Sequence, residues 1–71
     1  MTTYSSAQYY EDARYMVRRA RHELGQAVLT GPSNREYRAE CLLVVASHLL
    51  KAAEYRDKAR ARRKLEASDA D

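Results

Sequence analysis

The chain has 71 residues, with 13 Lys or Arg against 10 Asp or Glu, so its net charge is only +3. A chain this short forms at most one domain, whose core rarely supplies more than about 3–5 kcal/mol of stability. Small folds therefore add disulfides, a metal or a partner. The lone Cys41 excludes an internal disulfide, and together with His22 and His48 it fits no zinc spacing. We expect a partner, and no metal or cofactor.

No targeting or membrane segment is predicted. The N-terminal residues lack the basic start and apolar run of a signal peptide. The longest apolar run, from Cys41 to Ala46, is far shorter than the roughly 20 residues that cross a bilayer. We therefore expect a cytoplasmic protein that does not enter a membrane.

The first helix has a clear start signal. Ser5 and Gln8 have the spacing of a capping box, in which each side chain accepts a hydrogen bond from the other residue's backbone N–H. Tyr4 and Tyr9 occupy the two positions of a hydrophobic staple around this box. The pattern predicts a helix over about residues 6–29.

A stop and a second start follow. Gly31 favours the left-handed conformation past a helix end, and Pro32 cannot continue a helix, so we expect a turn at 30–33. Ser33 and Glu36 repeat the capping box and predict a second helix over about 34–63, followed by a frayed acidic tail at 64–71. A loop this short makes the two helices antiparallel neighbours, so the expected fold is an all-α hairpin.

The two predicted helices differ in the width of their apolar faces. The first carries a narrow seam of Tyr10, Ala13, Val17, Ala20, Leu24 and Ala27. The second carries the seam Leu42, Val45, Leu49 and Ala52, with a parallel stripe of Leu43, Ala46, Leu50 and Ala53. A helix that is apolar around more than half its circumference is buried on more than one side. One narrow seam cannot cover this second helix.

The surplus apolar surface predicts association. We expect the hairpin to complete a bundle by homo- or hetero-oligomerisation, and to form a homodimer in isolation. A four-helix bundle with no further role is the plainer alternative. The partner surface is assigned to the second helix, at Tyr37, Leu43, Val44, Ala46, Leu50 and Ala53.

Residues 51–64 hold seven basic side chains against Glu54 and Asp57. If the ligand were RNA or DNA, the phosphate contacts would come from Arg56, Arg60, Arg63 and Lys64. Arg14, Arg18 and Arg21 add a basic stripe to the first helix. Acidic neighbours neutralise much of this charge, which favours a solvated helix face, and we expect no binding to nucleic acid.

Catalysis is not predicted, because the sequence has no phosphate-binding glycine loop, nucleophile elbow or paired-carboxylate motif. Cys41 is expected to be a small core or interface residue. His48 is expected to be packed or partly exposed. The tyrosines near the N-terminus suit an interface as well as they suit a staple.

Residues 24–50 resemble the small co-chaperones of type III secretion needle subunits. The local match runs from Gly31 to Arg38: a glycine turn, a few polar residues, then Glu36-Tyr37-Arg38 opening a Leu/Ala-rich helix. The resemblance implies a bacterial protein that joins a tetratricopeptide-type chaperone and keeps a needle subunit soluble before export. Two alternatives remain: a phage- or plasmid-encoded inhibitor of a host protein, and an RNA- or DNA-binding four-helix-bundle dimer that the chain resembles in architecture only.

Overall fold

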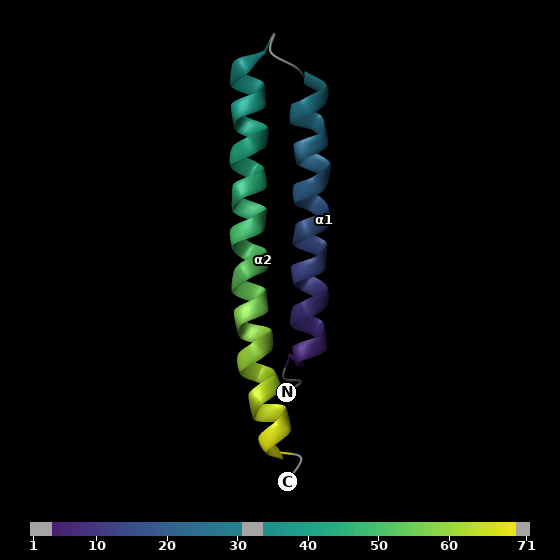
Figure 1. Ribbon diagram of the computed structural model, residues 1–71, viewed down its shortest axis with the longest axis vertical. Helices are drawn as coiled ribbons and strands as arrows, with labels where there is room; N and C mark the ends of the chain where they lie inside the picture. The colour runs from purple at the N-terminus through teal and green to yellow at the C-terminus, as the bar shows by residue number, and fades with distance from the viewer. Residues whose placement is uncertain (1–3, 31–33, 70–71) are drawn as a thin grey trace.

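The computed structural model describes residues 4–30 and 34–69 and confirms the all-α antiparallel hairpin. Helix α1 spans Ser6–Thr30 and helix α2 spans Arg35–Asp69, and the two lie side by side along their length (Figure 1). The chain measures 59 × 19 × 13 Å with a radius of gyration of 16.4 Å. A compact domain of this length has a radius of gyration of about 11 Å. The hairpin is therefore a single elongated layer in which each helix has one neighbour.

The start of α1 forms as the sequence predicts. The Ser5 N–H donates to Gln8 Oε1 at 2.8 Å, and the Gln8 N–H donates to Ser5 Oγ at 3.3 Å. The Tyr4 and Tyr9 rings pack with their centroids 4.9 Å apart, as a staple requires. Both halves of the capping signal are confirmed, so local contacts stabilise the start of α1.

The start of α2 lies one residue later than the predicted box. The Asn34 side chain is the cap: its Oδ1 accepts a hydrogen bond from the Tyr37 N–H at 3.1 Å. Asn is among the best residues at this position because its side-chain oxygen satisfies a free N–H of the first turn. Ser33, Gly31 and Pro32, on which the predicted box and turn depend, lie outside the described residues.

The predicted end of the second helix is wrong, because α2 continues past residue 63 to Asp69. The extra turns have a partner in the first turn of α1. Ser6 donates its backbone N–H to Glu66 Oε2 at 3.3 Å and its hydroxyl to Glu66 Oε1. A carboxylate is also favourable beside the positive end of a helix dipole. The tail that the sequence predicts to be frayed therefore stays helical, and the Glu66 side chain holds it against α1.

The Glu66 contact makes stability depend on pH. Hydrogen bonds from Ser6 hold the pKa of the Glu66 carboxyl below its ordinary value, with smaller help from Arg62 and Arg63. A lowered pKa in the folded state adds stability above the unfolded pKa, and this stability disappears as the pH falls below about 4. We expect Glu66→Gln to melt at a lower temperature than the parent at pH 7, with the difference closing at pH 3 (values chosen on either side of the Glu pKa). Thermal melts followed by circular dichroism check this; a difference that stays constant across pH would contradict it.

Small side chains form the contact between the helices. Among the described residues, the buried hydrophobic side chains are Ala13, Ala20, Ala27, Cys41, Ala52 and Ala59. In α1 they recur every seven residues, and Ala52 and Ala59 have the same spacing in α2. The Ser6–Glu66 contact sets the register, which places Ala13 opposite Ala59 and Ala20 opposite Ala52. Alanine facing alanine lets two helix backbones approach closely, because nothing larger holds them apart.

The predicted seams are only partly right. Every alanine assigned to them is buried, Val45, Tyr10 and Val17 are half-buried, and Cys41 is a core residue as expected. Leu42 and Leu49 were expected inside, yet they are 43% and 49% exposed, and Leu24 is also exposed. Half-buried His48, Tyr55 and Arg62 instead complete the inner face of α2. The helices face each other through their small residues, which turns the leucines outwards.

Candidate functional site

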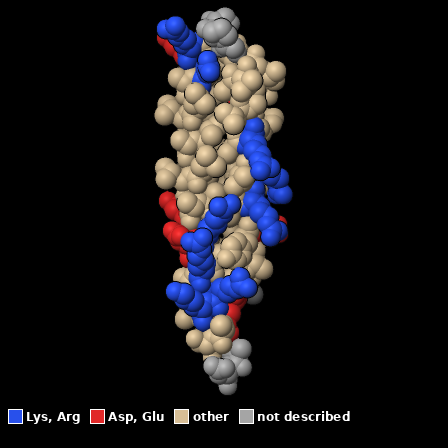
Figure 2. Space-filling view, viewed as in Figure 1, with Lys and Arg blue, Asp and Glu red and all other residues tan. Residues whose placement is uncertain are grey.

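Six large aliphatic side chains are exposed in the half of the hairpin nearest the turn: four flank the contact between the helices, and Leu43 and Leu50 lie on the outer side of α2. This apolar face consists of Leu24, Val28, Leu42, Leu43, Leu49 and Leu50. Leu43 and Leu50 are the most exposed of the four leucines from α2, at 71% and 68%. On the side of the molecule drawn in Figure 2, the turn-proximal half below the tip is almost free of charged residues. Contiguous apolar surface of this kind marks interaction sites in soluble proteins.

All six residues assigned to the partner surface are exposed, but they do not lie together. Leu43, Ala46, Leu50 and Ala53 follow one stripe of α2 on the apolar face. Tyr37 and Val44, seven residues apart, lie on the opposite edge of the helix. There the Tyr37 hydroxyl hydrogen-bonds with Cys41, which raises the Tyr37 pKa. Of the six, Ala53 lines a hollow that α1 shares through Val17, and Leu43 and Leu50 lie on the outer side of α2.

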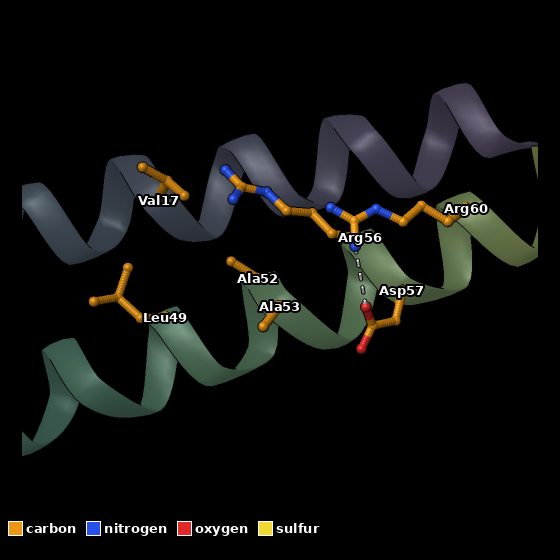
Figure 3. A pocket seen from close by; sticks show the side chains of 7 residues that line it. All are labelled: Val17, Leu49, Ala52, Ala53, Arg56, Asp57 and Arg60. Atoms are coloured by element: carbon orange, nitrogen blue, oxygen red, sulfur yellow. Dashed lines mark ion pairs between the residues drawn. The ribbon is translucent and has the colours of Figure 1, made fainter.

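The other half of the same side is a shallow groove with basic walls. Arg14, Arg18 and Arg21 line it from α1, and Arg56, Arg60, Arg63 and Lys64 line it from α2. We call these seven residues the basic groove. Its floor is apolar, with Val17, Ala52 and Ala53 at the end that adjoins Leu49. In Figure 3 the Arg56 side chain extends from α2 towards α1 above this floor, and the Arg60 side chain runs along α2 to its ion pair with Asp57.

Acidic neighbours neutralise only part of this charge. Arg14 pairs with Glu11 at 2.8 Å, and Arg60 lies 3.9 Å from Asp57. Both pairs are exposed, so each is worth little. Within residues 4–30 and 34–69, Arg18, Arg21, Arg56 and Arg63 form no ion pair. The sequence suggested two separate basic clusters, and the antiparallel register joins them into one.

Two of the tyrosines near the N-terminus, Tyr4 and Tyr9, pack on the hairpin itself, whereas Tyr15 is 50% exposed. Tyr9 bridges Tyr4 and Tyr55, with its ring centroid 6.4 Å from that of Tyr55. Lys51 and Lys58 lie over the Tyr55 ring at 5.7 and 5.9 Å. A hydrogen bond to the Asp12 carboxylate raises the pKa of Tyr4. These contacts favour a structural role for the cluster over the alternative of an interface.

Residues 4–30 and 34–69 also bear on two other kinds of site. No three His, Cys, Asp or Glu side chains in this part of the chain gather to hold a metal ion. Neither of its helices is long and apolar enough to cross a membrane.

Comparison of the chain with protein-family models, curated proteins and solved structures finds no match.

Proposed function

We propose that the chain is a protein-binding helical hairpin that docks through its apolar face. The supporting observation is that the large aliphatic side chains lie outside the helix–helix contact while alanines fill it. Fully burying a leucine is worth about 1.5–3 kcal/mol, so six exposed aliphatic residues are a strong driving force for association. In the isolated hairpin these side chains remain in contact with water, so this free energy of burial is not gained.

The exposed area is large enough for a stable interface. The chain exposes 5731 Å². A compact monomer of 8.2 kDa exposes about 4,500 Å², so the excess is about 1,200 Å². A standard interface buries about 800 Å² on each partner. Docking one protein on the apolar face would bring the exposed surface close to that of an ordinary globular protein.

The resemblance of residues 24–50 to needle co-chaperones gives this proposal a specific partner. In that form of the proposal, the hairpin binds a tetratricopeptide-type chaperone, and the pair keeps a needle subunit soluble before its export. The apolar face contains Leu24, Val28 and four of the five leucines of α2, all within the residues that carry the resemblance. In isolation, a second copy of the chain covers the same leucines.

Sedimentation across a concentration series tests the proposal. We expect the chain alone at micromolar concentration to sediment as a dimer, with a melting temperature that rises with concentration, because association stabilises the folded state. Adding the chaperone and needle subunit of the same organism should replace this homodimer with a complex that contains all three proteins. A monomer with a cooperative, concentration-independent melt, and no complex with either protein, would overturn the proposal.

A further inference from the structure

The apolar face and the basic groove form one continuous strip. Leu49 and Ala53 border both: Leu49 belongs to the apolar face, and both residues line the groove together with Arg56 and Arg60. From residue 43 to residue 63, α2 rises about 30 Å at 1.5 Å per residue. Figure 2 shows the two halves meeting on one side of the molecule, with basic side chains gathered below the uncharged region.

A second copy of the chain cannot cover the whole strip. In a parallel arrangement, two basic grooves would face each other, and like charges in contact repel. In an antiparallel arrangement with full overlap, each groove would lie on the leucines of the other copy and lose its hydration without gaining a partner charge. A homodimer therefore covers only the turn-proximal half, and the groove stays open.

We infer that the strip is the docking site for an amphipathic helix of a partner protein that is apolar over one half and carries several carboxylates over the other. This inference rests on the proposed function and specifies the partner's chemistry. A helix of about 20 residues spans the 30 Å strip. Its leucine-rich half packs on Leu42 and Leu49 with Leu50 at the edge, and its carboxylates meet arginines from both walls of the groove.

Charge spacing and floor chemistry favour a helix over a nucleic acid. Arg14 and Arg21 lie seven residues apart on α1, as Arg56 and Arg63 do on α2, so each pair repeats after about 10.5 Å. Carboxylates seven residues apart on a partner helix have the same repeat. The floor of Val17, Ala52 and Ala53 offers no hydrogen bonds to base edges. A nucleic acid would also leave the leucines uncovered, whereas an amphipathic helix covers both halves.

The test uses synthetic helical peptides and the full chain. Two labelled peptides of 21 residues each carry leucines along one half of a helix face and four glutamates along the other half (the length matches the strip at 1.5 Å per residue). One peptide has its glutamates in the N-terminal half, and the other has them in the C-terminal half. A matched pair replaces the glutamates with glutamine. Fluorescence anisotropy at low ionic strength should show the better glutamate peptide binding about tenfold more tightly than its glutamine partner, as expected for several exposed charge pairs.

Two double variants locate the effect. Arg56→Gln with Arg60→Gln should remove the preference for glutamate and leave the affinity for the glutamine peptide unchanged. Lys51→Gln with Lys58→Gln removes the same charge on the other side, beside Tyr55, and should keep the preference. Both pairs are exposed, and circular dichroism checks that the helices are retained.

The outcomes separate the two proposals. Equal binding of the glutamate and glutamine peptides overturns the inference but leaves docking on the apolar face intact. Binding of neither peptide overturns the inference, while docking on the apolar face is decided by the sedimentation experiment. A 21-nucleotide single strand or duplex (the probe length matches the peptides) that binds more tightly than the glutamate peptide, and loses binding in the arginine variant, assigns the groove to nucleic acid.

Discussion

Leu50→Glu should abolish both self-association of the hairpin and its binding to a partner protein. Leu50 lies in the middle of the exposed stripe of α2 and is 68% exposed in the hairpin, so it is available to a partner. Burying an unpaired carboxylate in an apolar interface is costly. We expect at least about 2.7 kcal/mol, or a hundredfold loss of affinity. Sedimentation reports the dimer, and titration calorimetry reports the complex with the partner.

Leu29→Glu is the matched control. Leu29 is 81% exposed and lies on α1, two residues after buried Ala27, so its side chain faces away from α2. The same substitution there should change association by no more than about 0.5 kcal/mol, which is usual for an exposed site outside an interface. If Leu50→Glu leaves both the dimer and the complex intact, the partner surface lies elsewhere. If Leu29→Glu is equally damaging, the interface surrounds the turn and is not confined to one side.

The parts of the fold that could be predicted from sequence are set by local contacts. The Ser5–Gln8 box and the Tyr4–Tyr9 staple involve residues three to five positions apart, and both form as expected. The end of α2 could not be predicted in this way. The hydrogen bonds from Ser6 to Glu66 join residues sixty positions apart, and they exist only because the hairpin brings the two helix ends together.

The helix–helix contact was misassigned for a different reason. Hydrophobicity alone ranks Leu42 and Leu49 above Cys41 and His48 as inward-facing residues, yet the leucines are the more exposed. The steric benefit of small residues decides the outcome. Alanines every seven residues on α1 can pack closely only against a matching small-residue row, which Ala52 and Ala59 supply. Residue size alone does not identify the seam either, because Ala39, Ala46 and Ala53 also recur every seven residues in α2 and are exposed.

The candidate site shows the same division between local and long-range information. Periodicity along α2 places Leu43, Ala46, Leu50 and Ala53 on one stripe, and the structure has them there. Which residues of α1 join that surface depends on the register between the helices. The register adds Leu24 and Val28 to the leucines, and it places Arg14 and Arg21 opposite the arginines of α2.

Ala59→Leu tests the close packing of small residues directly and should destabilise the hairpin strongly. Ala59 is 0% exposed, and the register places it opposite Ala13, so the added carbon atoms have no space unless the helices separate. Overpacking of a well-packed contact costs about 1–3 kcal/mol. That is a large share of the roughly 3–5 kcal/mol that a core of this size supplies. Thermal and urea unfolding followed by circular dichroism should show a lower midpoint at every protein concentration.

Ala61→Leu separates packing from helix propensity. Ala61 is exposed and only two residues away, and leucine is nearly as good a helix former as alanine, so the midpoint should move by less than about 0.5 kcal/mol. A midpoint that rises in Ala59→Leu would contradict close packing, because a larger side chain would then be filling space between the helices. In that case Leu42 and Leu49 could turn inwards, and the apolar face would lose two of its six residues. The stability of this one variant therefore bears on the docking surface as well as on the fold.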